Sequence, residues 1–336
     1  MLLWNLIVKF FKLPPTNEMH ERELYAFLSK EDDADFNVID SSGWCPIHRA
    51  IASSNGEIAK LLIHKCKGID LNISSCYKHT PLTFAIFEEN FKIVEILVKS
   101  RANVDQEDDR GWTPLTMAIK KGNQEILMLL LQNEANLNLI NSRKWSPINR
   151  AIESKNIEGI KSLIDFGADV NFNDANGWTP LQFAIYKDNL EIVSLLIERG
   201  ANIEFINIGW TPISKAIHEN KINIVQLLIS KGVNLNYNLP NGQSVLSKAV
   251  EKDNLEIVKL LVENGAKMNT PDGKGFTPFH IAIVKKHMTI VKFFKENGAN
   301  LVIRTVNFKN NAVELAMKPD HLDILKQLVY PEELKD

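Results

Sequence analysis

The sequence predicts an all-α solenoid, in which short helix-turn-helix units stack side by side and are joined by β-turn fingers. Three observations lead to this fold class. A phrase built on Trp-Thr-Pro recurs along the chain, as in GWTPLTMAI, GWTPLQFAI and GWTPISKAI. Its prolines follow one another at intervals of 35, 33, 33, 33, 32 and 66 residues, at Pro46, Pro81, Pro114, Pro147, Pro180, Pro212 and Pro278. Each phrase is followed by a second stretch with helical apolar spacing, such as EIVSLLIERG. A period in this range is typical of stacked repeats that bury a shared core.

The first helix of each unit is expected to begin at the recurring proline. Proline lacks the N–H that the first turn of a helix leaves without an acceptor, and a Thr side chain directly before it can cap that turn. Threonine takes this place in five copies, at Thr80, Thr113, Thr179, Thr211 and Thr277. Four residues further on, each copy carries an alanine that lets neighbouring helices approach closely: Ala50, Ala85, Ala118, Ala151, Ala184, Ala216, Ala249, Ala282 and Ala316.

A second helix follows, with an apolar face that includes Ile192 and Val193 in one copy. We expect Leu195 and Leu228 to lie in the core columns of two such helices. Glycine ends the second helix in five copies, at Gly167, Gly200, Gly232, Gly265 and Gly298, where it would adopt the left-handed conformation of a C-terminal cap. Asn or Asp with Gly then forms a turn toward the next copy, as between Asp174 and Gly177.

Nine copies are expected over residues 40–336. The interval of 66 residues holds two units, with Val245 in place of proline, and Ala312 marks a degenerate last copy that serves as the C-terminal cap. Residues 17–39 read as a capping half repeat, since a stack of this kind exposes an apolar face at each end. Residues 1–16 form an apolar N-terminal segment that is too short for a membrane span. We expect it to pack on the end of the fold, with a membrane-surface anchor or an export signal as the alternative.

A helix-turn-helix-turn unit of about 33 residues with this starting phrase resembles the ankyrin repeat. The resemblance covers about nine tenths of the chain. The family histidine of the phrase is present at His48 and His280, and the other copies carry polar residues in that column: Thr83, Thr116, Asn149, Gln182, Ser214, Ser247 and Glu314. The resemblance implies a protein-binding scaffold that uses its turn tips and the concave side of its first helices.

The composition is that of an ordinary folded protein. Of 336 residues, 45% are hydrophobic and 24% charged, and 39 Lys and Arg against 41 Asp and Glu give a formal charge of −2. These values exclude a disordered charged tail and a polytopic membrane protein, and they predict no global attraction to nucleic acid. Cys45, Cys66 and Cys76 contain no CxxC pair, which indicates neither a disulfide framework nor a zinc site and favours a reducing, intracellular and cytoplasmic setting.

No catalytic signature is present, and we expect no enzyme activity, no cofactor and no bound metal. Cys45 lies in the column of the capping threonines, where a packed thiol is expected rather than a nucleophile. His48 and His280 lie in the family's histidine column, where a hydrogen-bonding role in the scaffold is expected. Stacked repeats also leave no deep central cavity for a substrate.

The candidate binding residues lie two positions before the start of each first helix. Five of the six tryptophans occupy this column, which consists of Trp44, His79, Trp112, Trp145, Trp178, Trp210 and Phe276 in the copies that carry a ring there. Two interpretations stay open. The rings form a ladder of partly exposed side chains that grips a partner, because tryptophan dominates binding hot spots, or they pack on the next finger and are structural.

Basic residues accompany the rings around the third to fifth copies. They are Arg110, Lys120, Lys121, Arg143, Lys144 and Lys187, and Tyr186 precedes the last of them. Such a patch would accept an acidic-aromatic peptide. Single-stranded nucleic acid that stacks on the tryptophans is the weaker alternative, because Asp108 and Asp109 oppose it. A solvated face of mixed charge is the third interpretation.

We therefore expect a monomeric, non-catalytic scaffold or adaptor that binds a partner protein on its concave face. The richness in Ile, Lys and Asn is typical of AT-rich genomes, and many ankyrin proteins of intracellular bacteria act on host proteins, which adds the hypothesis of an effector delivered into a host cell. The alternative function is binding to nucleic acid or a membrane surface, through Lys120, Lys121, Arg143 and Lys144 or through residues 1–13.

Overall fold

The computed structural model describes residues 36–40, 43–66, 68–75, 78–206, 209–240, 242–305, 309–317 and 321–329. Within these ranges the chain forms the helices α3 to α20 and no β-strand, apart from one isolated antiparallel bridge between Asn238 and Ser244. The predicted all-α fold class is confirmed. The N-terminal segment 1–16 and most of the capping half repeat 17–39 lie outside the described residues.

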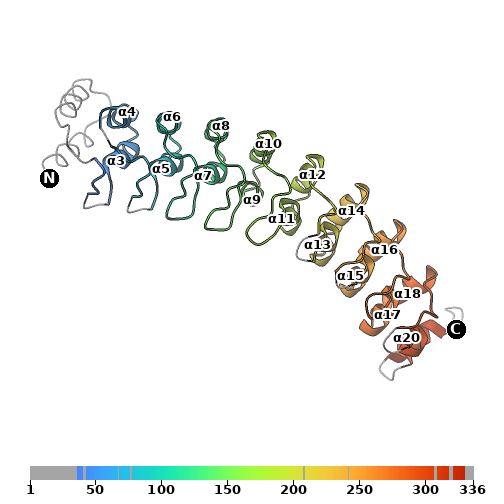
Figure 1. Ribbon diagram of the computed structural model, residues 1–336. Helices are drawn as coiled ribbons and strands as arrows, with labels where there is room; N and C mark the ends of the chain where they lie inside the picture. The colour runs from blue at the N-terminus through green and yellow to red at the C-terminus, as the bar shows by residue number, and fades with distance from the viewer. Residues whose placement is uncertain are drawn as a thin grey trace. The chain divides into compact units, whose positions relative to one another are not determined.

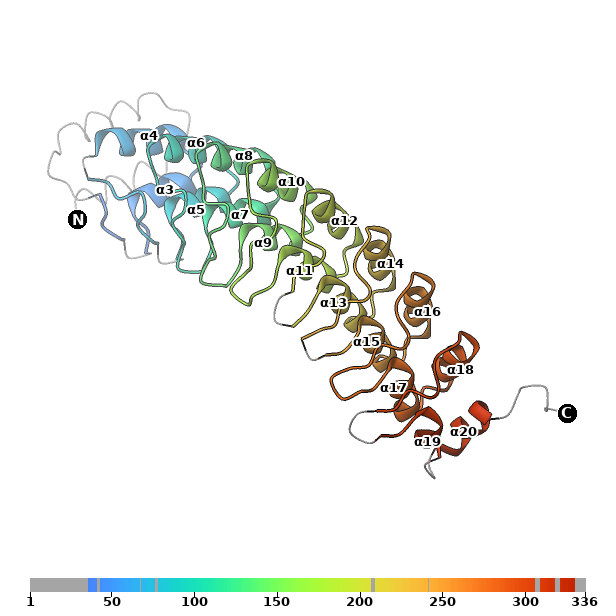
Figure 2. The same ribbon diagram turned by 45° about the vertical axis from the view of Figure 1, so that its right-hand side comes forward.

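The helices belong to two compact units, Met1–Asn176 and Gly177–Asp336. In the first unit, the first helices of the repeats are α3 (Pro46–Ala52), α5 (Pro81–Phe87), α7 (Pro114–Lys121) and α9 (Pro147–Glu153). The second helices are α4 (Gly56–Lys65), α6 (Phe91–Lys99), α8 (Gln124–Gln132) and α10 (Ile157–Asp165). The first helices pack side by side in one row, and the second helices form a parallel row beside it (Figures 1 and 2).

The second unit repeats the same two-row arrangement. Its first helices are α11 (Pro180–Tyr186), α13 (Pro212–His218), α15 (Val245–Glu251), α17 (Pro278–Lys285) and the short α19 (Ala312–Ala316). Its second helices are α12 (Leu190–Glu198), α14 (Ile222–Ser230), α16 (Leu255–Glu263), α18 (Met288–Glu296) and α20 (Leu322–Val329). The C-terminal copy ends in the amphipathic helix α20, which buries Ile324 and Leu328.

The helix starts are capped as predicted. The hydroxyl groups of Thr80, Thr113, Thr179, Thr211 and Thr277 accept a hydrogen bond from the backbone N–H three residues later, directly before a proline at the first helical position. Six of the second helices use asparagine for the same purpose: the side chains that accept the corresponding N–H are those of Asn55, Asn90, Asn123, Asn156, Asn189 and Asn254. This second set of caps explains part of the asparagine content of the chain.

The core lies between the two rows of helices. All nine alanines of the predicted column are fully buried. Leu228 of α14 is fully buried as well, but the expectation for Leu195 is wrong, because this residue is only half-buried in α12. Its neighbour Leu196 is fully buried and occupies the position that corresponds to Leu228. In a helix one residue turns the side chain by about 100°, so an error of one position moves it away from the core.

Side chains in the loops after the second helices join each repeat to the next. Asn72 Oδ1 accepts the backbone N–H of Asn103 at 2.9 Å, and Asp105 Oδ1 accepts that of Asn136 at 2.8 Å. In the second unit, Asn236 and Asn269 accept the N–H groups of Lys267 and Asn300 at 2.9 Å and 3.0 Å. The ladder fixes the register between neighbouring repeats, each bond contributing about 1 kcal/mol.

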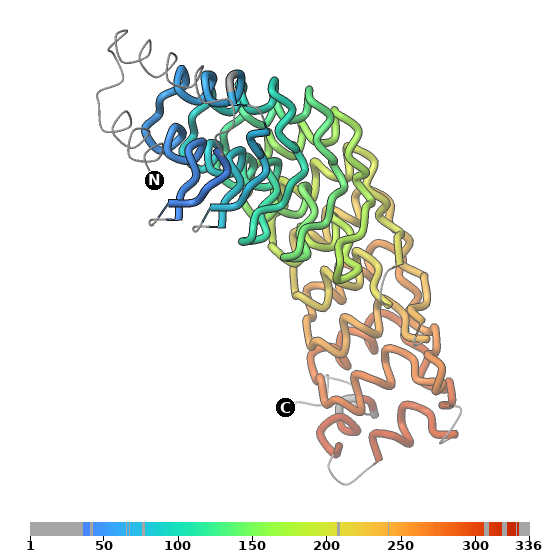
Figure 3. The backbone as a smooth tube through the Cα atoms, turned by 60° about the vertical axis from the view of Figure 1, so that its left-hand side comes forward, coloured from blue at the N-terminus to red at the C-terminus, as the bar shows by residue number. Residues whose placement is uncertain are grey.

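The fingers extend from the edge of each unit, past the row of first helices (Figure 3). Their turns place one residue in the left-handed region, which glycine occupies without strain at Gly111, with φ of 80°. Lys144 takes the same position in the next finger, with φ of 65°. The fingers thereby hold the residues that precede the first helices in fixed places, and those residues form the candidate site.

Candidate functional site

The ring column, defined as Trp44, His79, Trp112, Trp145, Trp178, Trp210 and Phe276, lies at the junction of finger and first helix. Four of these rings are fixed by the same turn, in which an Asp or Asn four residues earlier accepts the backbone N–H of the ring residue. The carboxylates of Asp40, Asp108 and Asp272 and the amide oxygen of Asn141 do so at 2.8–2.9 Å. The backbone of each ring is therefore held before any partner binds.

A second column interleaves with the rings in the first unit. Its members lie three positions after the first residue of each first helix. The guanidinium carbon of Arg150 lies 4.5 Å from the ring centroid of Trp112 and 4.5 Å from that of Trp145. Likewise the ring of Phe84 lies 5.0 Å from Trp44 and 6.1 Å from His79. Arg150 and Phe84 thus each contact the rings of two successive repeats.

The second unit has the same interleaved arrangement with lysines. Lys215 Nζ lies 4.4 Å from the ring centroid of Trp178 and 5.7 Å from that of Trp210. Lys248 Nζ lies 5.2 Å from the ring of Trp210. Cation–π contacts of this kind stabilise by about 0.5–2 kcal/mol each. The rings consequently connect successive repeats, as the structural interpretation of the column predicts.

The rings differ in their exposure. His79 and Trp112 are buried, with 3% and 6% of their surface exposed, and they offer little contact area to a partner. The expectation of partly exposed rings is therefore wrong for these two residues. His79 Nδ1 lies 2.7 Å from Asp108 Oδ2 in the finger of the following repeat, which gives this ring a role in joining repeats. Trp44, Trp145, Trp178, Trp210 and Phe276 are half-buried.

In each unit, a more exposed aromatic side chain lies beside the rings, on a first helix and three positions after the member of the interleaved column. Phe87 and Tyr186 are 43% and 48% exposed. The ring of Phe87 lies 5.4 Å from that of His79, and the ring of Tyr186 lies 5.2 Å from that of Trp178. These contacts hold two exposed aromatic side chains against the ring column.

The basic residues of the predicted patch are distributed over both units. In the first unit, Lys120 Nζ and the Arg143 guanidinium carbon lie 4.4 Å and 5.1 Å from the ring of Trp112, and Arg143 Nε donates to the carbonyl oxygen of Arg110. Lys144 is exposed at the tip of the same finger as Arg143.

The remaining two lysines contact other rings. Lys121 Nζ lies 4.7 Å from the ring of Phe87 and pairs with Glu89 at 3.0 Å. Lys187 belongs to the second unit and lies 5.6 Å from the ring of Tyr186.

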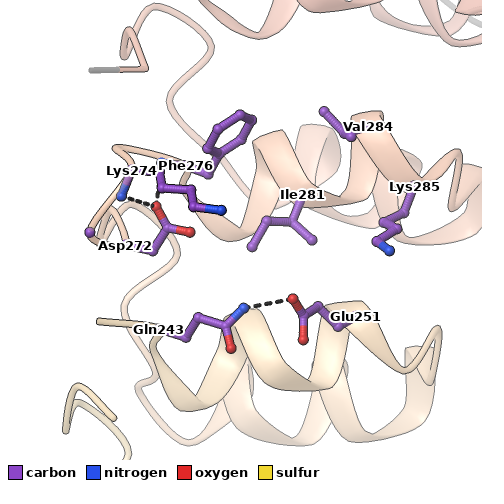
Figure 4. A pocket seen from close by; sticks show the side chains of 9 residues that line it. Gln243, Glu251, Asp272, Lys274, Phe276, Ile281, Val284 and Lys285 are labelled. Carbon is purple, nitrogen blue, oxygen red and sulfur yellow. Dashed lines mark hydrogen bonds between the residues drawn. The ribbon is translucent and has the colours of Figure 1, made fainter. Parts of the chain in front are cut away.

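A pocket of about 380 Å³ lies between the repeats of α15 and α17 (Figure 4). Phe276, Ile281 and Val284 form its apolar part, and Glu251 faces them from α15. The carboxylate of Glu251 accepts a hydrogen bond from Gln243 Nε2 at 2.6 Å. The pocket is open and lined by both charge signs, which suits an apolar side chain of a bound peptide better than a buried cofactor.

Comparison with known proteins agrees with this geometry. A sequence model that describes ankyrin repeats in sets of three matches residues 17–108, 88–174, 148–241, 216–305 and 246–335. The chain belongs to the ankyrin-repeat family. It is also 34% identical over 83 residues to an ankyrin repeat protein of Rickettsia felis, a match that covers 25% of this chain and 27% of the relative. The matched stretch thus spans about a quarter of that protein's length.

Two residues of the ankyrin histidine column, His48 and Gln182, bond to the next repeat, whereas Nε2 of His280 is buried and has no hydrogen-bond partner among the described residues. His48 Nε2 lies 3.0 Å from the carbonyl oxygen of His79, and Gln182 Nε2 donates to that of Trp210 at 3.0 Å. Threonine or serine in this column bonds within its own helix start instead, as Thr116 does with Thr113. The family phrase therefore tolerates substitution without loss of the stack.

One pair in this ankyrin stack has the composition of a catalytic dyad. Cys45 Sγ lies 2.8 Å from His48 Nδ1, and both side chains are buried. Burial raises the pKa of the Cys45 thiol to about 11 and lowers the pKa of His48 to about 4, so both groups are neutral at pH 7. A neutral, inaccessible thiol is a poor nucleophile.

The described part of the ankyrin array contains neither a candidate metal site nor a candidate membrane-spanning helix. Within it, no group of three or more His, Cys, Asp or Glu side chains is placed to hold a metal ion. None of the helices there has the length and the apolar run that crossing a bilayer requires.

Sequence reasoning missed the interleaved column. Its basic members are Arg49, Arg150, Lys215 and Lys248, which lie three residues after the first residue of their helices. That constant offset was visible in the sequence. What it does not show is that a residue at this position reaches back to the ring of the preceding repeat, since this contact depends on how closely the first helices pack.

Proposed function

We propose that this ankyrin-repeat chain is a non-catalytic adaptor that binds a segment of a partner protein on its ring face. In each unit, the ring face comprises the rings of that unit's part of the ring column and the side chains beside them. These side chains are the exposed Phe87 and Lys120 in the first unit, and the exposed Tyr186 and half-buried His218 in the second. Ankyrin repeats are protein-protein interaction modules, and what we propose is the face and the manner of binding.

The observation that carries the proposal is that Tyr186 is exposed and yet held in place by its neighbours. This side chain is 48% exposed, yet its ring meets Trp178 at 5.2 Å and an interplanar angle of 89°, and Lys215 Nζ lies 5.4 Å from it. An exposed aromatic side chain that is already held in place loses little conformational entropy on binding. Tyrosine in such a setting is typical of binding hot spots.

The stacked helices support the same conclusion. The ring face lies on the row of first helices, which are short and have capped starts. Residues of neighbouring repeats hold the rings in place. A partner segment therefore meets a surface that needs no folding step of its own.

The proposal is tested by selecting peptides from a random phage-displayed library on the purified chain and measuring their affinity by fluorescence anisotropy. Tyr186→Ala should weaken binding of the selected peptides about tenfold or more, with little change in the melting temperature. Phe166→Ala is the matched control, because Phe166 is 41% exposed but lies at the end of the second helix α10, away from the ring face.

Two results would contradict the proposal. Selection could yield no peptide that binds the chain in solution. Alternatively, the Phe166→Ala and Tyr186→Ala variants could lose affinity equally, which would place binding outside the ring face.

A further inference from the structure

Three cations surround one buried indole in the first unit. Lys120 Nζ, the Arg150 guanidinium carbon and the Arg143 guanidinium carbon lie 4.4 Å, 4.5 Å and 5.1 Å from the ring centroid of Trp112. Lys120 and Arg143 are exposed and Arg150 is half-buried, so solvent reaches the group from outside while Trp112 lies beneath it. We call Lys120, Arg143 and Arg150 the cationic cluster.

The cluster has no ion-pair partner within the described residues, and nearby acidic groups are engaged elsewhere. Asp108 bonds His79, and Glu107 accepts hydrogen bonds from the backbone and side chain of Ser142. Glu89 pairs with Lys121. The charge of Glu153 favours the charged form of Arg150 and offsets part of the effect of burial on its pKa. Arg150 Nε is buried and finds no hydrogen-bond acceptor in the described part of the chain.

The corresponding lysines of the second unit differ in this respect. Lys215 pairs with Glu219 at 2.8 Å, and Lys248 lies 3.5 Å from Glu251. In α9, Ser154 stands where α13 is followed by Glu219 and supplies no charge, whereas Glu153 stands where α15 has Glu251 and acts on Arg150 through its charge. The lysines of the second unit are thus ion-paired, whereas Lys120, Arg143 and Arg150 form no ion pair among the described residues.

The excess positive charge acts on the cluster itself. The pKa of Lys120 is lowered, first by partial burial and then by the charges of Arg150, Arg143 and Lys121. An anion placed among the three side chains would relieve this repulsion, and an arginine fork binds a carboxylate with two parallel hydrogen bonds.

We propose that the cationic cluster binds the carboxylate of an Asp or Glu side chain in the partner segment that the ring face holds. This inference rests on the proposed function and names one feature of the partner. A protein carboxylate fits better than nucleic acid, because Trp112 is 6% exposed and has no free face on which a base could stack. Exposed Asp109 nearby would repel a phosphate chain, with one charge per nucleotide, more strongly than a single carboxylate.

The test uses the selected peptides and three variants of the full chain. Arg150→Met keeps an unbranched side chain between the two indoles and removes the charge, and Lys120→Met does the same at an exposed position that folding tolerates. Lys215→Met is the matched control, since Lys215 also lies between two indoles but is paired with Glu219. Each variant is titrated with a fluorescent selected peptide and with its Glu→Gln or Asp→Asn counterpart.

We expect the selected peptides to share an acidic position, and its neutralisation to weaken binding to the unmodified chain about tenfold or more. Lys120→Met and Arg150→Met should each cause a similar loss of affinity. Neutralising the peptide as well should weaken binding little further, because the change in the peptide and the change in the chain remove the same interaction. In the Lys215→Met variant, neutralising the acidic position of the peptide should still weaken binding about tenfold or more.

Other outcomes overturn the inference. The inference is overturned, and the proposed function left intact, if the binding peptides share no acidic position. It is also overturned if the loss of affinity caused by neutralising the peptide and the loss caused by Lys120→Met or Arg150→Met simply add. The same holds if an oligothymidine binds the unmodified chain and loses affinity for Arg150→Met, since this would assign the cluster to nucleic acid. A library that yields no binding peptide overturns the proposed function and this inference with it.

Discussion

His48 Nε2 lies 3.0 Å from the carbonyl oxygen of His79, so a buried ring in one repeat is bonded to the finger of the next. A carbonyl oxygen only accepts, so Nε2 carries the proton of the neutral ring. The other ring nitrogen, Nδ1, is then free to accept from the thiol of Cys45 at 2.8 Å. This arrangement uses the neutral form of histidine, and burial accordingly lowers the pKa of His48 to about 4.

The lowered pKa predicts a loss of stability in mild acid. In the unfolded chain His48 takes up a proton below about pH 6.5, whereas in the folded chain it stays neutral down to about pH 4. The contribution of His48 is complete above pH 6.5 and is lost as the pH falls to 4, by about 3 kcal/mol of unfolding free energy. Urea denaturation across this pH range measures the decline.

A matched variant isolates His48 from the other titrating groups. His48→Gln should flatten the decline, because glutamine does not titrate and Gln182 shows that this side chain can bond the next finger from the same column. Some decline will remain, since burial also lowers the pKa of His280. An unchanged pH profile in His48→Gln would refute the assignment.

The core register gives a second prediction. Leu196→Ala and Leu228→Ala should each lower the free energy of unfolding by about 2–5 kcal/mol, because both side chains are fully buried. Leu195→Ala should cost clearly less, since Leu195 is half-buried in the same helix. Equilibrium denaturation of the three variants checks this order, and an equal loss for Leu195 and Leu196 would contradict the register.

Trp112 and Tyr186 should separate stability from binding. Trp112→Ala removes a buried indole that Arg150 of the next repeat covers, and it should cost about 3–5 kcal/mol of stability. Tyr186→Ala removes an exposed ring and should leave the melting temperature nearly unchanged. Thermal unfolding followed by circular dichroism distinguishes the two, and a Trp112→Ala variant that melts like the unmodified chain would show that the ring is not structural.

The fold was predictable because its determinants are local and recur. Thr113 before Pro114 specifies a capped helix start within four residues, and the buried alanine that follows repeats at a constant offset. The register of Leu195 was not predictable to one residue, because both Leu195 and Leu196 are apolar and only packing decides which one faces the first helices.

The candidate site was predictable in position but not in character. The offset before each proline located Trp112 and Trp178, yet the burial of Trp112 depends on Arg150, which lies 38 positions later in the sequence. Likewise the pairing of Lys215 with Glu219, and the lack of such a pairing for Arg150, decide where positive charge remains. These are contacts between side chains, and the periodicity of the chain carries no information about them.

Lys144 allows a last prediction, about the finger before α9. Its φ of 65° lies in the left-handed region, where other fingers have Gly111 and Gly275 with φ of 80° and 82°. A side chain in this region costs about 1–2 kcal/mol relative to glycine, partly offset by the greater freedom of glycine in the unfolded chain. The backbone N–H of Lys144 donates to the carbonyl oxygen of Asn141 at 2.8 Å, and glycine would keep that bond.

Lys144→Gly should therefore raise the free energy of unfolding by about 0.5–1 kcal/mol, measured by urea denaturation. Stabilisation could have a second cause, because Lys144 lies beside Arg143 and removing its positive charge relieves the repulsion between them. Lys144→Ala is the control, because it removes the same charge but keeps the side chain that is strained at positive φ. Stabilisation by glycine alone assigns the effect to the backbone, whereas equal stabilisation by alanine would assign it to charge and contradict the prediction.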